Sequence, residues 1–173
     1  MSNTKKLVIT GLMSALMCVL SPFSFPLFGG IGLSLGIMVV LFMAYVLELP
    51  MGTISCGIYI LLGIVGLPVF AGFSGGIGVL LGPTGGFIGG YIILSLIAGI
   101  FVKIGKGNRL VFFGGALFGL LCCYLLGTLW YMHVSNVSFV PAITVCVLPY
   151  VVFDIVKIII VCILGPILKK NIK

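Results

Sequence analysis

Two oppositely charged side chains, Asp154 and Lys157, stand in the last apolar stretch of the chain. Their spacing of three places them on the same face of a helix, and Tyr150 lies one turn before Asp154. A charged residue at the centre of a membrane helix costs about 3 kcal/mol on insertion scales, so such residues usually line a cavity or pair with each other. This stripe of phenol, carboxylate and ammonium predicts a site for a zwitterionic or amide-bearing ligand.

A purely structural role is the alternative, in which Asp154 and Lys157 neutralise each other and hold the bundle together. Buried ion pairs that serve stability alone are often replaceable by apolar residues, so we favour a polar pocket. Pro149 predicts that the last helix begins nearby, because proline is tolerated in the first turn of a helix. At about 1.5 Å per residue, both charges then lie roughly 8–12 Å below the outer end.

The sequence lacks the residues that catalysis or metal binding would need. The chain has two acidic residues, Glu48 and Asp154, so paired-carboxylate catalysis is not available. The patterns HExxH and GxxxxGK[ST] are absent, and the six cysteines show neither CxxC pairing nor spacing with histidine for a metal. We expect no enzyme, no metal site and no bound cofactor.

The composition indicates an integral membrane protein. Hydrophobic residues make up 62% of the chain and charged residues 6%, against about a quarter charged in soluble domains. The net charge of +7 does not indicate nucleic-acid binding, because the basic residues lie between apolar runs. The prediction is an all-α bundle in one domain, residues 1–173, with six spans at 7–21, 30–47, 51–67, 84–102, 110–131 and 142–168.

The basic residues predict the orientation in the membrane lipid. Eight of the nine lie before the first span, between the fourth and fifth, or after the last: Lys5, Lys6, Lys103, Lys106, Arg109, Lys169, Lys170 and Lys173. The positive-inside rule assigns these clusters and both termini to the cytoplasm. Lys157 is the exception. The first segment has no signal-peptidase pattern, so we expect it to remain as a helix.

The outer connection 66–86 is apolar and rich in Gly and Pro, which predicts a lid or a re-entrant segment covered by protein. Tyr124, Trp130 and Tyr131 fit an aromatic belt near the outer end of the fifth span. We expect these three to anchor the helix and to have no chemical role.

The first span contains a small-xxx-small pair, Gly11 and Ala15, with Ser14 beside it. Such a face lets a second helix approach closely. Packing within the bundle and docking to a separate membrane partner are both open at this point.

Two stretches, GLPVFAGFSGGIGVLLGPTGGFIGGY (66–91) and LPYVVFDIVK (148–157), resemble the biotin-specific S components of energy-coupling factor transporters, the BioY family. The resemblance covers nearly the whole chain, because six helices, the GPTGG motif and the DxxK motif occur in family order. One departure is Gly11, which stands where the family motif AxxxA usually begins.

The resemblance implies that the protein captures biotin outside a prokaryotic cell membrane and delivers it inward with a membrane T component and two cytoplasmic ATPases. It also implies that Asp154 and Lys157 contact the vitamin, and that Gly11 and Ala15 dock the partner. The other expected ligand contacts are Tyr150, Thr84, Gly82, Gly85, Gly86, Phe73 and Ser74.

The chemistry of biotin suits these residues, since its ureido N–H groups suit a carboxylate and its carboxylate suits an ammonium or backbone N–H donors. Which end meets which residue is open, as is whether the two charges bind each other until the vitamin separates them. The alternatives are an S component for another vitamin, an autonomous carrier with Asp154 as its protonation site, and a structural subunit.

Overall fold

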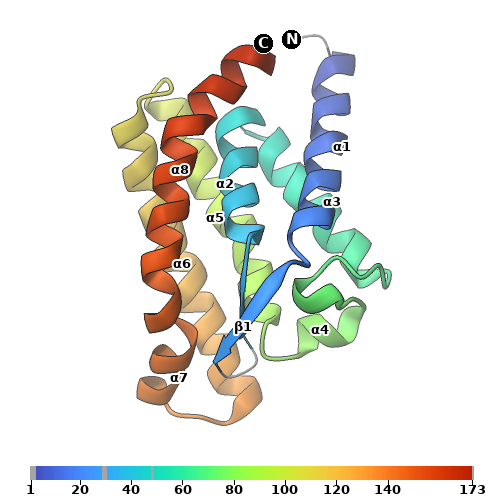
Figure 1. Ribbon diagram of the computed structural model, residues 1–173, viewed down its shortest axis with the longest axis vertical. Coiled ribbons are helices and arrows are strands. Elements are labelled where there is room, and N and C mark those ends of the chain that lie inside the picture. Colours follow the sequence, from blue (N-terminus) through green and yellow to red (C-terminus); the bar gives the residue numbers. More distant parts are fainter. Residues whose placement is uncertain (1–2, 29–30, 48, 173) are drawn as a thin grey trace.

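The computed structural model describes residues 3–28, 31–47 and 49–172, so Glu48 and Lys173 lie outside it. Within these residues, six apolar helices form an elongated bundle, and the start of α1 and the end of α8 lie at the same end (Figure 1). The α5–α6 connection lies there too, so the predicted basic clusters gather on one side. The six helices are α1 (Asn3–Leu20), α2 (Gly36–Leu47), α3 (Met51–Ile64), α5 (Gly85–Ile104), α6 (Arg109–Ser135) and α8 (Leu148–Ile172).

Four of these helices, α1, α5, α6 and α8, are long and apolar enough to cross a membrane. α2 and α3 have 12 and 14 residues, against about 20 for a straight crossing of a hydrocarbon core about 30 Å thick. The prediction of a helical membrane bundle is therefore confirmed, whereas six complete crossings stay a prediction.

The first outer connection differs from the prediction. An antiparallel hairpin of β1 (Ser24–Phe28) and β2 (Ile31–Ser34) follows α1, and α2 begins at Gly36 instead of residue 30. Pro22 and Pro26 prevent α1 from continuing, because proline has no backbone N–H to donate. Ser34 ends the hairpin and its Oγ accepts a hydrogen bond from the Gly36 N–H at 3.2 Å.

The second outer connection is a compact lid, as the Gly and Pro content predicts. It contains the short 3₁₀ turn η1 (Ala71–Phe73) and the one-turn helix α4 (Ile77–Leu81), which leads into α5. The Gly76 N–H donates to the Gly63 carbonyl at 2.7 Å, and the Gly72 N–H donates to the Pro22 carbonyl at 3.0 Å. The lid is thereby tied both to the end of α3 and to the chain that follows α1.

The predicted last span, 142–168, is two helices. α7 (Phe139–Cys146) ends at Val147, whose φ of −120° and ψ of −57° depart from helical values, and α8 begins at Leu148. Pro149 explains the break, because a proline disfavours helical geometry in the preceding residues and accepts a place in the first turn. The prediction that the last helix begins near Pro149 is confirmed.

Glycines let α5 and α6 pack closely. A Cβ at Gly115 would lie 2.2 Å from the Phe101 Cβ, and one at Gly127 would lie 2.3 Å from the Phe87 ring. Only a residue without a side chain fits at such positions, as is common where membrane helices approach closely.

Tyr45 joins α2 to the end of the bundle that carries both termini. Its buried hydroxyl donates to the Gly107 carbonyl at 3.0 Å, and its ring packs edge-to-face on Phe112 at 4.8 Å between centroids. The Lys169 ammonium lies 5.4 Å from the centre of the same ring. This end of the bundle is therefore filled by side chains.

The α5–α6 packing predicts opposite results for two adjacent glycines. We expect Gly115→Ala to lower the free energy of unfolding by about 1–3 kcal/mol, because the new methyl group overlaps Phe101. Gly114 has no atom within 4 Å of a built Cβ, so Gly114→Ala should leave stability equal or slightly higher. Thermal unfolding of the purified proteins in detergent measures both, and equal melting temperatures for the two variants would contradict the packing.

Candidate ligand-binding site

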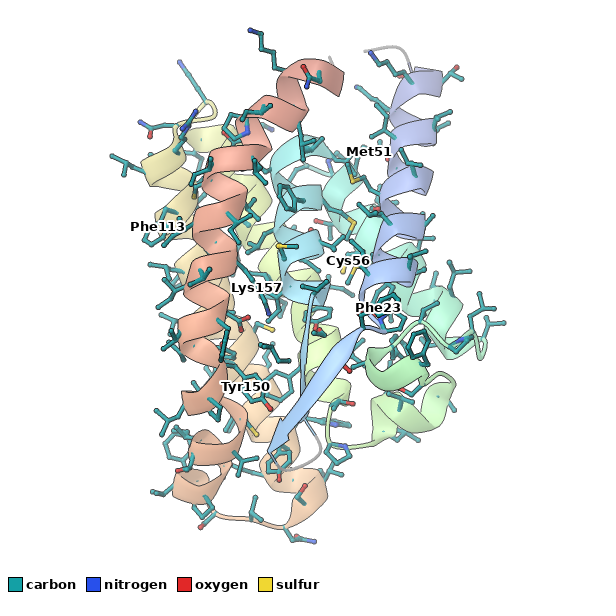
Figure 2. The ribbon with its side chains drawn as sticks, viewed as in Figure 1. Phe23, Met51, Cys56, Phe113, Tyr150 and Lys157 are labelled. Atoms are coloured by element: carbon teal, nitrogen blue, oxygen red, sulfur yellow. The ribbon has the colours of Figure 1, made fainter. Side chains whose placement is uncertain are left out.

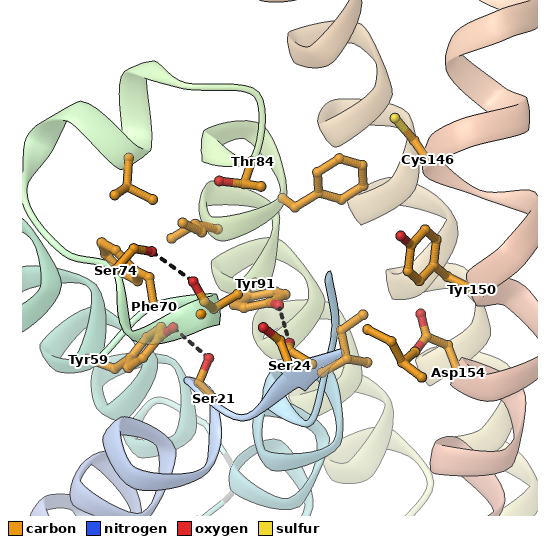
Figure 3. Close-up of a pocket in the computed structure, with 18 of the residues that line it drawn as sticks. Ser21, Ser24, Tyr59, Phe70, Ser74, Thr84, Tyr91, Cys146, Tyr150 and Asp154 are labelled. Atoms are coloured by element: carbon orange, nitrogen blue, oxygen red, sulfur yellow. Dashed lines mark hydrogen bonds between the residues drawn. The ribbon is translucent and has the colours of Figure 1, made fainter. Parts of the chain in front are cut away.

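A cavity of about 310 Å³ opens among α8, α5, α6, the hairpin and the lid, in the half of the molecule away from the termini. Lys157 and Tyr150 lie on the part of α8 that faces it (Figure 2). Figure 3 shows Asp154, Tyr150 and Cys146 on one side of the cavity, with Ser21, Tyr59 and Ser74 on the other.

The charged wall is a closed hydrogen-bonded group. The Lys157 ammonium lies 2.7 Å from Asp154 Oδ1 and donates to the Ser34 carbonyl at 2.7 Å. The Tyr124 hydroxyl donates to Asp154 Oδ2 at 2.5 Å. Asp154 and Lys157 are 1% and 7% exposed, so each charge is buried but has partners from other elements. The wall is polar and carries no net charge.

The opposite wall is made of hydroxyl groups. Ser21 Oγ and the Tyr59 hydroxyl lie 2.8 Å apart, and Ser74 Oγ donates to the Ala71 carbonyl at 2.8 Å (Figure 3). Ser24 and Thr84 also line the cavity. Apolar side chains of Leu33, Ile37, Phe70, Val79, Phe87 and Ile88 complete it. The cavity therefore has polar groups on two opposite sides, with apolar side chains and the Tyr91 hydroxyl also in its lining (Figure 3).

Five of the predicted ligand contacts line this one cavity: Asp154, Lys157, Tyr150, Thr84 and Ser74. The expectation that the i, i+3 pair shares one face is met directly by the ion pair. Contact of these residues with a ligand stays a prediction.

The three predicted pocket glycines do not line the cavity but shape the turn between α4 and α5. A Cβ at Gly85 would lie 1.7 Å from the Leu80 carbonyl oxygen, and one at Gly86 would lie 2.3 Å from the Trp130 Cβ. The Gly82 carbonyl accepts a hydrogen bond from Trp130 Nε1 at 2.9 Å. These glycines therefore let the turn pack on α6, which places Thr84 at the cavity.

Phe73, another predicted ligand contact, lies outside the cavity. Its side chain is 60% exposed and does not line the cavity, and its ring packs edge-to-face on Phe23 at 5.4 Å between centroids. Phe73 has a left-handed backbone, with a φ of 57°.

Tyr124 is a residue that the sequence interpretation missed, since an anchoring role in the aromatic belt is wrong for it. Its ring is buried and its hydroxyl binds Asp154. The signal was its depth: Tyr124 lies seven residues, about 10 Å, before the end of the predicted span at 131, which is within the predicted depth range of the two charges. Ser34, Ser21 and Tyr59 were missed because contacts across the fold place them at the cavity.

Gly11 and Ala15 lie on an exposed face of α1, and a Cβ at Gly11 would meet no atom within 4 Å. α1 packs on α3 through a different face, where Ser14 Oγ lies 2.8 Å from Ser55 Oγ. Packing within the bundle is therefore the wrong interpretation of the Gly11 and Ala15 pair, and docking to a partner stays a prediction.

The described part of the chain has no group of three or more His, Cys, Asp or Glu side chains that could hold a metal ion. The cavity instead offers neutral donors and acceptors around one ion pair, which suits non-covalent recognition of a small polar molecule.

Comparisons with known proteins agree with this geometry. The biotin transporter BioY of Thermotoga maritima is 35% identical over 169 residues, which cover 96% of each chain. The probable biotin transporter BioY of Pyrococcus horikoshii is 43% identical over 129 residues, which cover 75% of each chain. BioY2 of Lactococcus lactis subsp. cremoris, also named a biotin transporter, is 33% identical over 167 residues, 95% of this chain and 91% of that one.

The fold is similar to the crystal structure of the S-component for biotin from an ECF-type ABC transporter, with a TM-score of 0.91 and 26% identity. The match covers 98% of this chain and 95% of that one. The model of the BioY family matches residues 1–173. The resemblance of the 66–91 and 148–157 motifs is thus confirmed over the full length, and the chain belongs to the BioY family.

Proposed function

We propose that this protein is the biotin-binding S component of an energy-coupling factor importer. It captures biotin outside a prokaryotic cell membrane and delivers it to the cytoplasm with a membrane T component and two cytoplasmic ATPases. The observation that carries the proposal is the neutral Asp154–Lys157 pair on one wall of a cavity of about 310 Å³. That volume is at the lower end of small-molecule pockets and suits a vitamin.

The ureido ring of biotin suits the charged wall. A urea edge presents N–H and C=O groups side by side without net charge, and the ion pair presents an acceptor and a donor side by side, also without net charge. The biotin carboxylate is a poorer partner there. Any carboxylate close to Lys157 also lies close to Asp154, whose negative charge opposes it.

The carboxylate then meets the hydroxyl wall, where Thr84 and the remaining O–H of the Ser21–Tyr59 pair are neutral donors. Hydrogen bonds from neutral groups to a carboxylate are charge-assisted and therefore stronger than bonds between neutral groups. The apolar side chains of the lining accommodate the thioether ring and the alkyl chain.

The competing interpretations fit less well. In an autonomous carrier Asp154 would have to exchange protons with solvent, but it is buried and both of its oxygens accept hydrogen bonds from protein groups. An S component for another vitamin is tested directly by biotin titration, since absence of biotin binding to the purified wild-type protein would sink the proposal.

Removal of either charge should weaken biotin binding. We expect Asp154→Asn and Lys157→Met to raise the Kd at least about 30-fold, since each removes a charged hydrogen-bonding partner worth about 2 kcal/mol. The measurement is titration of detergent-purified protein with biotin. Lys103→Met is the matched control, because Lys103 is exposed at the far end of α5.

A single variant that leaves a buried unpaired charge costs about 3–5 kcal/mol of stability and risks unfolding. The double variant Asp154→Asn with Lys157→Met has no unpaired charge and keeps the test usable. Biotin binding by the folded double variant at wild-type affinity would show that the site is elsewhere.

If α1 docks the partner subunits, a variant on its exposed face should impair biotin uptake and leave biotin binding unchanged. We expect Gly11→Leu to abolish concentrative biotin uptake in cells that express the ATPases and T component, because the side chain blocks close helix approach. Biotin binding by the purified variant should be unchanged. Gly89→Leu is the matched control, since Gly89 is also exposed and has no atom within 4 Å of a built Cβ.

Uptake that is equal in the two glycine variants would contradict docking through this face of α1. Uptake that persists in cells without the ATPases would contradict the coupled mechanism itself.

A further inference from the structure

We propose that Tyr124 is a positioning residue for ligand recognition, which fixes the Asp154 carboxylate so that its remaining lone pairs face the ureido edge. This inference rests on the proposed function and deepens it. It concerns the buried hydrogen bond of 2.5 Å from the Tyr124 hydroxyl on α6 to Asp154 Oδ2 on α8.

The two oxygens of Asp154 have different partners. Lys157 binds Oδ1 from the same helix, three residues further along, and Tyr124 binds Oδ2 from α6. Lys157 is itself fixed by the Ser34 carbonyl at the end of β2. Three elements, α6, α8 and β2, thus meet at this ion pair.

A single contact would leave the carboxylate poorly oriented. The terminal torsion of an aspartate side chain has a broad distribution, so one hydrogen bond to Oδ1 alone defines the plane of the carboxylate only loosely. A second donor on the other oxygen removes that freedom. Because a carboxylate has about four lone-pair sites and two are used, the other two stay available to ligand N–H groups.

Tyr124 is suited to this role because its own position is determined by packing. Its ring is buried, and α6 is held against α5 by the close contacts at Gly119 and Gly127 on either side. The Gly119 Cβ position lies 3.0 Å from Leu94, and the Gly127 position lies 2.3 Å from Phe87. The packing of α6 on α5 therefore fixes the Tyr124 hydroxyl, which in turn orients the Asp154 carboxylate.

The test compares two buried tyrosines that each lose one hydroxyl hydrogen bond. Tyr124→Phe should raise the biotin Kd about tenfold, which corresponds to about 1.4 kcal/mol. Tyr45→Phe removes the bond to Gly107 outside the cavity, so it should lower the melting temperature without changing the Kd. Both Kd values are measured by titration at 25 °C, where the proteins are folded.

A merely structural Tyr124 would behave like Tyr45, with a lower melting temperature of the ligand-free protein and an unchanged Kd. That result overturns the inference, and so does tighter binding by Tyr124→Phe, which would mean that Tyr124 competes with the ligand for Asp154. In both cases the wild type still binds biotin, so the proposed function survives. If the wild type does not bind, the proposed function fails first.

The end of the ligand that Tyr124 affects is tested with biotinamide, which keeps the ureido ring and lacks the carboxylate. Tyr124→Phe should weaken biotin and biotinamide by the same factor, because the effect passes through Asp154 to the ureido edge. A loss of affinity for biotin alone would place the effect of Tyr124 at the carboxylate and overturn the inference.

Discussion

The buried ion pair is the constraint around which this half of the molecule is organised. Two charges removed from water lose hydration worth several kcal/mol each, and their mutual attraction offsets that loss only when the remaining donors and acceptors find partners. Here the partners come from separate elements, since Ser34 at the end of the hairpin accepts from Lys157 and Tyr124 of α6 donates to Asp154. The hairpin and α6 must therefore lie close to α8 for the pair to be tolerated.

The glycines between α5 and α6 also support the ion pair, although they do not contact it. Tyr124 reaches Asp154 only if α6 holds its place, and α6 is held by α5 through positions where any side chain would overlap Phe87 or Phe101. Gly86 and Trp130 extend this contact to the turn that carries Thr84. Close helix packing and the geometry of the cavity are thus one feature, because the same helix pair supports both cavity walls.

Local patterns predicted the parts of the structure that local physics determines. Helical periodicity placed Asp154 and Lys157 on one face, and Pro149 located the start of α8. The hairpin was missed because Ile31 and Leu33 join the apolar run that continues into α2, so hydropathy does not mark the start of that helix. Tyr124 and Ser34 were missed because their roles depend on contacts between elements far apart in sequence, which no single-sequence pattern contains.

The structure also changes how ligand binding should be understood. From sequence alone, it is open whether the two charges bind each other until the vitamin separates them. In the structure, Asp154 Oδ1 and Lys157 are 2.7 Å apart, and each charged group still has unused hydrogen-bonding capacity: two lone-pair sites on the carboxylate and one N–H on the ammonium. A urea has N–H donors and a carbonyl acceptor for these positions. Under the proposed function, we therefore expect biotin to add to the pair without breaking it, so that binding avoids the cost of exposing two separated charges in a low-dielectric interior.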